Sequence, residues 1–147
     1  MLKSISIIYP VYNEEKRLKK TFNDIKKFNK KFNLLKKEFI FVNDGSSDKT
    51  QLVLKKKFNN NKHVKIISYR KNKGKGFALK KGIGIAKNQW ILTTDADCSV
   101  SNLQIADWIK KKYVTNNIKI YFGSRNHKLS KVKKKISRLK IGKIFKL

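Results

Sequence analysis

Short apolar runs alternate with amphipathic segments along most of the chain. The runs comprise residues 5–9, 39–42, 64–69, 90–94 and 118–122. Runs of this length that are rich in β-branched and aromatic residues and are bounded by turn residues are typical of buried β-strands. We therefore predict five strands, the first of which ends before Pro10.

The segments between the runs carry apolar residues at three- and four-residue steps, the spacing of one helix face. The first segment has such residues at Leu18, Phe22, Ile25, Phe28, Phe32 and Leu35. The helix N-caps that we expect are Asn13, then Ser46 or Ser47, and later Ser101 or Asn102. Glu14 and Glu15 are expected in the first turn of the first helix, and a third helix is expected to run through Ala86.

Strands that alternate with helices predict a mostly parallel sheet covered by helices on both faces, which is an α/β fold. At 147 residues the chain has the usual size of one domain. Ligands of such sheets bind outside the carboxyl ends of the strands. The loops that follow the strands are therefore where we look for a functional site.

The net charge is strongly positive. Thirty-eight Lys and Arg residues against nine Asp and Glu give a formal charge of +29. This charge favours polyanionic partners: nucleic acid, an anionic bilayer or a phosphorylated substrate. Because the lysines are spread along the whole chain, the alternative is that they simply cover its exposed faces.

Cys98 is the only cysteine, which excludes an internal disulfide and a multi-cysteine zinc site. No apolar run approaches the ~20 residues that cross a bilayer, and the first residues do not read as a signal peptide. We therefore expect a cytoplasmic protein whose contact with a membrane is peripheral, at the cytoplasmic face.

Asp95 and Asp97 follow the fourth run, with one small residue between them. Alternate side chains of a near-extended segment point the same way, so both carboxylates can bind one divalent cation. The same tripeptide is common in turns that cap a helix. The acidic residues as a group favour the site, because six of the nine follow predicted strands: Glu14, Glu15, Asp44, Asp48, Asp95 and Asp97.

Five motifs follow the predicted strands in order. They are PVYNEE at 10–15, VNDGSSD at 42–48, NKGKG at 72–76, DAD at 95–97 and GSR at 123–125. Together they resemble the ordered motifs of family 2 glycosyltransferases with the GT-A fold. Within that family the likeness is greatest to dolichyl-phosphate or polyprenyl-phosphate β-glucosyltransferases, followed by mannosyl-phosphate synthases.

The resemblance implies a nucleotide-sugar site. The residues that match the donor-binding positions of the family are Pro10, Tyr12, Glu14, Val42, Asp44, Lys73, Gly74, Asp95 and Ala96. Rings and proline offer apolar contact, carboxylates accept hydrogen bonds from base and ribose, and the glycine–lysine loop can approach phosphate. The structural alternatives are a core aromatic at Tyr12 and a helix-dipole partner at Glu14.

The resemblance also implies the chemistry. Asp95 and Asp97 are assigned to a Mg²⁺ or Mn²⁺ ion on the donor diphosphate and Arg125 to a phosphate, and these three are the expected catalytic residues. The implied reaction transfers a sugar with inversion to a polyprenyl or dolichyl phosphate, with UDP-glucose as the expected donor. The alternatives are GDP-mannose as donor, or a non-catalytic basic protein that binds nucleotides or nucleic acid. We expect no specific nucleic-acid partner, because strand-end carboxylates would repel phosphate.

The chain departs from the family pattern in two places. Asn43 stands where relatives commonly carry an aspartate. After residue 125 only residues 126–147 remain, so we interpret 1–125 as the nucleotide-sugar-binding domain of a C-terminally truncated protein, with little transferase activity alone.

The tail, residues 126–147, has nine Lys or Arg and no acidic residue. Apolar residues recur in it at helical spacing, at Leu129, Val132, Ile136 and Leu139. This pattern predicts a basic amphipathic helix that contacts an anionic membrane or, alternatively, packs on the missing acceptor half.

Overall fold

The computed structural model describes residues 2–111, 113–115, 120, 121 and 123. The helices and strands of the described residues lie in one compact unit, Met1–Asn116, and a second unit, Asn117–Leu147, falls almost entirely outside the described residues. Arg125, the tail and most of the predicted strand 118–122 are outside them too, although residues 120 and 121 are described and are not in a strand. The division of the chain at residue 125 stays a prediction.

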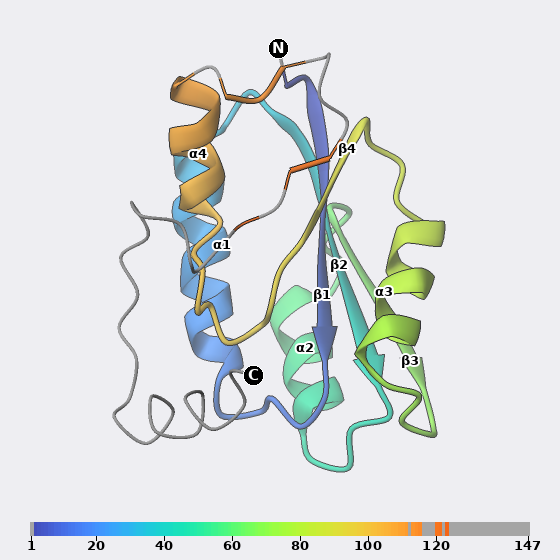
Figure 1. The fold of residues 1–147 in the computed structure, drawn as a ribbon. Coiled ribbons are helices and arrows are strands. Elements are labelled where there is room, and N and C mark those ends of the chain that lie inside the picture. The colour runs from blue at the N-terminus through green and yellow to red at the C-terminus, as the bar shows by residue number, and fades with distance from the viewer. Residues whose placement is uncertain (1, 112, 116–119, 122, 124–147) are drawn as a thin grey trace, which may run out of the picture. The chain divides into compact units, whose positions relative to one another are not determined.

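Strands and helices alternate through this unit (Figure 1). The strands are β1 (Ser4–Val11), β2 (Lys36–Asp44), β3 (Val64–Tyr69) and β4 (Trp90–Thr93). The helices are α1 (Leu18–Lys31), α2 (Thr50–Phe58), α3 (Lys75–Gly84) and α4 (Leu103–Lys110). The strands pair in parallel in the order β3-β2-β1-β4, which confirms the predicted α/β class. Among the described residues, no helix is long and apolar enough to cross a membrane.

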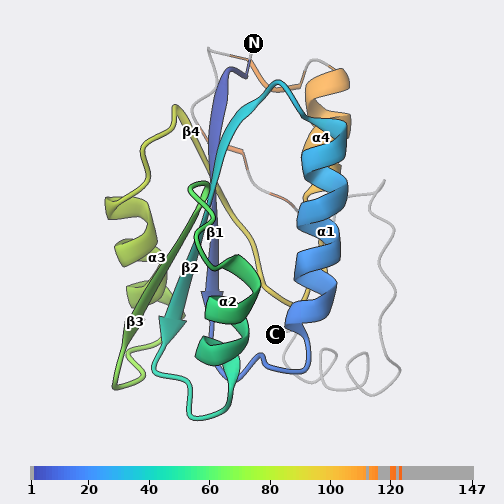
Figure 2. The same ribbon diagram turned by 180° about the vertical axis from the view of Figure 1, so that it is seen from behind.

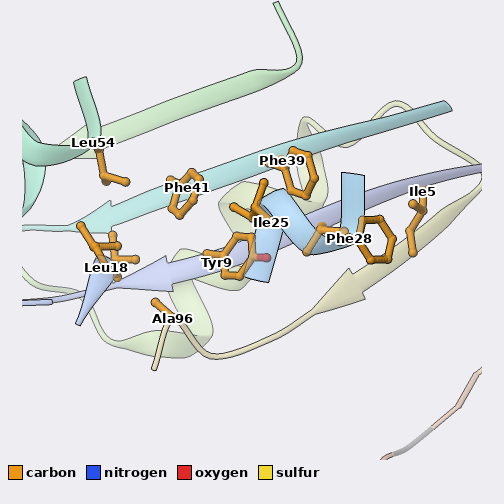
Figure 3. Packing of buried hydrophobic residues seen from close by; sticks show 11 residues of the cluster. Ile5, Tyr9, Leu18, Ile25, Phe28, Phe39, Phe41, Leu54 and Ala96 are labelled. Atoms are coloured by element: carbon orange, nitrogen blue, oxygen red, sulfur yellow. The ribbon is translucent and has the colours of Figure 1, made fainter. Parts of the chain in front are cut away.

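Side-chain alternation in the central strands separates two apolar clusters. Tyr9 and Phe41, whose rings stack with centroids 4.8 Å apart, belong to the cluster that contains residues of α1 and α2 (Figure 3). Ile8, Ile40 and Val42 belong to the other cluster, with α3. Figures 1 and 2 show α1 and α3 on opposite sides of the sheet. Because both faces are covered, the central strands are apolar along nearly their whole length.

Helix α3 approaches the sheet closely at Gly82. A Cβ atom there would lie 2.5 Å from Cγ2 of Ile8 and 3.2 Å from Cγ2 of Val42. Glycine is therefore required for α3 to pack at this distance, and a side chain would push the helix away from β1 and β2.

Pro10 lies inside β1, so the prediction that the strand ends before it is wrong. Pro10 pairs with Val42 in the register of β1 and β2. The Ile8 carbonyl accepts a hydrogen bond from Thr94 N at 3.1 Å, so Pro10, two residues later, faces the same edge beyond the last paired residue of β4. Its missing N–H therefore costs no ladder hydrogen bond to β4.

The predicted caps of the first two helices are wrong. Helix α1 begins at Leu18, so Glu14 and Glu15 precede it, and α2 begins at Thr50; neither has a side-chain cap at its N-cap residue. Asp48 accepts a hydrogen bond from Thr50 N at 2.9 Å and takes the role expected of the serines. Asn13 is drawn into a different set of bonds, described below.

The predicted start of the last helix is confirmed, since Asn102 is the N-cap residue of α4. Ser101 Oγ accepts a hydrogen bond from Leu103 N at 3.2 Å and donates one to Asp24 on α1. Asn102 N donates to Asp24 at 2.9 Å, and the Asn102 side chain donates to the Tyr9 hydroxyl. Buried polar groups of β1 and α1 thus fix the start of α4.

Candidate functional site

A pocket of about 390 Å³ opens at the carboxyl ends of the strands. Its lining comes from the ends of β1 and β2, the start of α3 and the loops that follow β1, β3 and β4. It consists of Pro10, Val11, Tyr12, Glu14, Asp44, Asn72, Gly74, Lys75, Asp95, Ala96 and Asp97. Parallel strands bring their carboxyl ends to one edge, which is why such distant segments meet here. The volume is that of a small-molecule site.

Eight of the residues predicted for the site line this pocket: Pro10, Tyr12, Glu14, Asp44, Gly74, Asp95, Ala96 and Asp97. Two others do not. Val42 is fully buried and belongs to the cluster on the α3 side of the sheet. The Lys73 ammonium lies over the Phe77 ring, 4.7 Å from its centroid. Arg125 lies outside the described residues.

Asn13 joins the loop after β1 to the loop after β2. Its Oδ1 accepts hydrogen bonds from Ser47 N at 2.9 Å and Asp48 N at 3.4 Å, and its N–H donates to Ser46 Oγ at 3.0 Å. Its φ of +53° is tolerated by asparagine and turns the chain toward these partners. These contacts explain why Asn13 does not cap α1.

Two acidic residues that follow the strands hold these same loops and do not line the pocket. Glu15 N donates to Asp48 Oδ2 at 3.1 Å, and Lys49 N donates to Glu15 Oε2 at 3.2 Å. Nearby, Glu14 N donates to Thr50 Oγ1 at 2.8 Å. The reciprocal bonds between the loops place the Glu14 side chain on the pocket wall.

Asn43, where the resemblance led us to expect an aspartate, also holds this loop. Its Oδ1 accepts hydrogen bonds from Ser46 N at 3.2 Å and from Ser46 Oγ at 2.5 Å. An amide oxygen accepts these bonds as a carboxylate oxygen would, so the loop does not require an acid here.

Asp44 fixes the loop that follows β3. Its Oδ1 accepts from Lys73 N at 2.8 Å, and its carbonyl accepts from Asn72 Nδ2 at 3.1 Å. A Cβ atom on the next residue, Gly45, would lie 2.5 Å from Asn72 N, and its φ of +68° also favours glycine. The loop over 70–74 therefore crosses directly above Gly45. Burial and the neighbouring Asp44 carboxylate raise the pKa of Tyr69.

The aspartate pair is anchored through the residue between its members. Ala96 is 2% exposed and packs in the same cluster as Tyr9 and Leu18 (Figure 3), and its carbonyl accepts a hydrogen bond from Thr21. Because the middle residue is buried, Asp95 and Asp97 are left at the pocket surface. Asp97 accepts hydrogen bonds from Ser99 N at 2.8 Å and Ser99 Oγ at 2.7 Å, which orient its carboxylate.

Lys75 is a pocket residue that the sequence analysis did not single out. Its Nζ lies 2.6 Å from Asp95 Oδ1, and the two side chains are 62% and 48% exposed. The signal available in the sequence was the paired lysines of the 72–76 motif, but their roles depend on where α3 begins. In the structure α3 starts at Lys75, so this lysine faces the pocket and Lys73 does not.

Four carboxylates share the pocket: Glu14, Asp44, Asp95 and Asp97. Burial raises the pKa of Glu14, and the charges of Asp97 and Asp48 raise it further, while Arg17 opposes them from 2.6 Å. A cation that entered this pocket would relieve the repulsion between the acids.

The aspartate pair fits a divalent cation that is shared with a ligand. Among the described residues there is no group of three or more His, Cys, Asp or Glu side chains that could hold a metal alone. Mg²⁺ in nucleotide sites is typically bound by one or two carboxylates, with phosphate oxygens and water as the other ligands. Asp95 and Asp97, on one wall of one pocket, meet that requirement.

Cys98 follows the pair and is not among the pocket-lining residues. Burial raises the pKa of its thiol, and a protonated thiol is a poor nucleophile.

Comparisons with known proteins agree with this geometry. The model of Glycosyl transferase family 2 matches residues 6–141. Dolichyl-phosphate beta-glucosyltransferase ALG5D of Trichomonas vaginalis is 35% identical over 150 residues, which cover 97% of this chain and 45% of the relative. The human Dolichyl-phosphate beta-glucosyltransferase is 38% identical over 102 residues, which cover 65% of this chain and 31% of the relative. The chain thus spans less than half the length of these relatives.

Solved structures share the fold. TarS 1-349 of S. aureus, in complex with UDP-GlcNAc, aligns with a TM-score of 0.60 and 25% identity over 73% of this chain and 30% of TarS. The mannosyltransferase PcManGT of Pyrobaculum calidifontis, in complex with GDP-Man and Mn²⁺, aligns with a TM-score of 0.61 and 21% identity. The alignment covers 72% of this chain and 31% of PcManGT. The parallel sheet with its strand-end pocket is the GT-A fold, and the chain belongs to glycosyl transferase family 2.

Proposed function

We propose that the pocket binds a nucleoside diphosphate sugar together with Mg²⁺ or Mn²⁺. The observation that carries this proposal is the meeting of Asp44, Asp95, Asp97 and the glycine loop around one pocket at the strand ends of a family 2 chain. Each of these groups can bind one part of such a ligand: the base, the ribose or the diphosphate with its cation.

The base and ribose are assigned to the wall formed by the loops after β1 and β2. Tyr12 is 48% exposed and Pro10 lies beside it on the lining, so both offer apolar contact to a base. The carboxylates of Glu14 and Asp44 accept hydrogen bonds from base N–H groups and ribose hydroxyls.

The diphosphate is assigned to the part of the lining that comes from the loops after β3 and β4. Helix α3 begins at Lys75 on the pocket lining, and the free N–H groups of a first helical turn favour phosphate. Asp95 and Asp97 would hold the cation, which neutralises charge on the departing diphosphate when it is bound. The residues of the chain supply position and counter-charge around that ion.

For the donor and acceptor we propose UDP-glucose and a polyprenyl or dolichyl phosphate, with inversion at the sugar. The names of the Trichomonas vaginalis and human relatives support this choice. An acceptor phosphate is already ionised at neutral pH, so its attack depends on positioning more than on a general base. We assign Arg125 to one of the reacting phosphates.

The formal charge of +29 supports peripheral contact with an anionic membrane, where a lipid phosphate would be met. We propose that this contact occurs at the cytoplasmic face and involves the basic tail. Co-sedimentation with liposomes tests it, and equal binding to anionic and neutral vesicles would remove this part of the proposal.

Thermal unfolding with added nucleotides tests the binding site. At a UDP concentration of about 100 times Kd the stabilisation is ~2.7 kcal/mol, which raises the Tm of a unit of this size by about 10 °C. We expect most of this rise in Tm to need Mn²⁺ or Mg²⁺ and to be lost in EDTA. We also expect UDP to raise the Tm more than GDP does. An equal shift with NAD, or none with either nucleotide, would contradict the proposal.

The matched variants are Asp97→Asn and Asp107→Asn. Asp97 lines the pocket, whereas Asp107 is exposed on α4 and its carboxylate lies 4.0 Å from Lys31 Nζ. Asp97→Asn should remove the metal-dependent part of the shift, and Asp107→Asn should leave it unchanged. Loss of the shift in both variants would indicate a general effect of charge.

A further inference from the structure

The side-chain ammonium that lines the pocket already has an anionic partner. Lys75 Nζ lies 2.6 Å from Asp95 Oδ1, on the side chain that the proposed function gives to a divalent cation. An oxygen that bonds an ammonium at this distance cannot at the same time bind a second cation without strong repulsion between the two charges. Lys75 and a metal ion would therefore compete for Oδ1 of Asp95.

The ion pair between Lys75 and Asp95 is weak enough to be broken by a ligand. Both side chains are substantially exposed, at 62% and 48%, and exposed ion pairs are weak. Neither neighbour of Lys75 is closely packed, since a Cβ atom at Gly74 or at Gly76 would meet nothing within 4 Å. This is the reverse of Gly45, where the chain is in tight contact. A flexible lysine between two glycines can therefore change partners without moving the helix.

We propose that Lys75 is an exchangeable counter-ion. In the ligand-free protein its ammonium neutralises Asp95, and when the divalent cation takes that carboxylate the ammonium transfers to the nucleotide diphosphate. This inference rests on the proposed function, and it adds a positioning residue that couples metal binding to nucleotide binding. The exchange involves no covalent bond. The Asp95 carboxylate and the Lys75 ammonium each have a partner of opposite charge before and after it.

The exchange has a signature that a structural role would not give. Removing the ammonium removes the competitor for Asp95, so Mn²⁺ alone binds more tightly. The same change removes a positive charge from the diphosphate, so UDP binds less tightly when Mn²⁺ is saturating. A variant that merely loosened the pocket would weaken both ligands.

The experiment compares the wild-type chain with Lys75→Met, Lys75→Arg and Lys80→Met. Lys80 is an exposed lysine of α3 that is not among the pocket-lining residues, so Lys80→Met controls for net charge. Free Mn²⁺ is measured by electron paramagnetic resonance without nucleotide, and UDP and uridine are titrated calorimetrically at saturating Mn²⁺. Tm values check that each variant is folded.

For Lys75→Met we expect the Kd of Mn²⁺ to fall about threefold and the Kd of UDP to rise about fivefold, with uridine unchanged. Lys75→Arg keeps the charge, so neither constant should improve on the wild type. Lys80→Met should match the wild type for all three ligands.

An unchanged or raised Kd for Mn²⁺ in Lys75→Met, in a background where the wild type binds both ligands, overturns the exchange and leaves the proposed function standing. A tighter Mn²⁺ site with unaltered UDP binding overturns the transfer to the diphosphate. Parallel weakening of uridine overturns it as well, because it shows a structural effect. If the wild type binds neither Mn²⁺ nor UDP, the proposed function and the exchange both fail.

Discussion

Two carboxylate–lysine pairs of nearly equal length have different surroundings in this protein. Glu38 Oε2 lies 2.7 Å from Lys65 Nζ, and Asp95 Oδ1 lies 2.6 Å from Lys75 Nζ. The Glu38 side chain is 12% exposed and that of Asp95 is 48% exposed. The distance between the charges therefore does not tell which pair builds the fold and which is open to a ligand.

The partners of Glu38 show the structural case. Its Oε1 accepts hydrogen bonds from Ser6 Oγ and from Lys87 N, each at 2.7 Å. Ser6 is the register partner of Glu38 in β1, and Lys87 lies between α3 and β4. The carboxylate thus ties the connection before β4 to the amino-terminal part of the sheet, and its burial is compensated on every side.

In the pocket at the other end of the strands, the pKa of Glu14 is shifted in the direction opposite to that of Glu38. Burial alone would raise the pKa of Glu38, but hydrogen bonds from Lys65, Ser6 and the Lys87 backbone hold it below its usual value. Burial raises the pKa of Glu14 in the pocket, and Asp97 raises it further. The Glu38 carboxylate is thus compensated by its three donors, whereas the neighbouring acids of Glu14 oppose its ionisation, an effect that a cationic ligand would offset.

The largest effect that we expect is on stability, from Glu38→Gln. The amide cannot form the ion pair and leaves Lys65 without its counter-charge, so the free energy of unfolding should fall by about 2 kcal/mol. Urea unfolding at pH 7 measures it. A loss below about 0.5 kcal/mol would show that the buried pair contributes no more than a surface pair.

The same variant predicts a pH dependence. Because folding lowers the pKa of Glu38 from 4.5, its stabilisation is present above that pH and is lost as pH falls through the folded-state pKa. The difference between the wild type and Glu38→Gln should be full at pH 6 to 7 and shrink in acid. A difference that stayed constant down to pH 3 would contradict the assignment of the shift to this carboxyl.

Asp95→Asn should change stability much less than Glu38→Gln. Its partner is exposed, so we expect the free energy of unfolding to stay within about 0.5 kcal/mol of the wild type. The metal-dependent stabilisation by UDP should be lost at the same time. A large loss of stability would mean that Asp95, like Glu38, stabilises the fold. It would contradict the proposed difference between the two ion pairs.

The smallest effect is that of salt. Exposed charges are screened at high ionic strength, so any stability difference of Lys75→Met, a few tenths of a kcal/mol, should vanish between 0.05 and 0.5 M NaCl. The difference for Lys65→Met should be larger and should persist, since Glu38 is shielded from solvent. Equal salt dependence in the two variants would contradict the contrast in burial.

The sequence predicted what depends on local patterns. The four described strands coincide with apolar runs, and the carboxylates after them meet at one edge because parallel strands end together. The sequence analysis assigned Ala96 to the donor site and did not predict its burial in the core, which depends on the packing of α1 against the sheet.

The errors concern partners that are distant in sequence. Asn13 was expected to cap α1, but its partner Ser47 lies 34 residues away and offers a competing set of hydrogen bonds. Val42 was placed in the site and is fully buried in the cluster on the α3 side of the sheet, so its role in donor binding stays a prediction. The role of Lys73 also stays a prediction, and Lys75 lines the pocket because the direction of its side chain depends on the first residue of α3, which the sequence does not fix.

Paramagnetic broadening by Mn²⁺ in the presence of UDP tests the central claim most directly. If the cation binds at Asp95 and Asp97, the amide signals of Gly74, Lys75 and Ala96 should broaden in ¹H–¹⁵N spectra. The amide of Glu38 lies six residues before Asp44 along β2, about 20 Å from it, and should broaden much less than these three. Broadening at Glu38 and Lys87 with sharp signals at Ala96 would contradict the account.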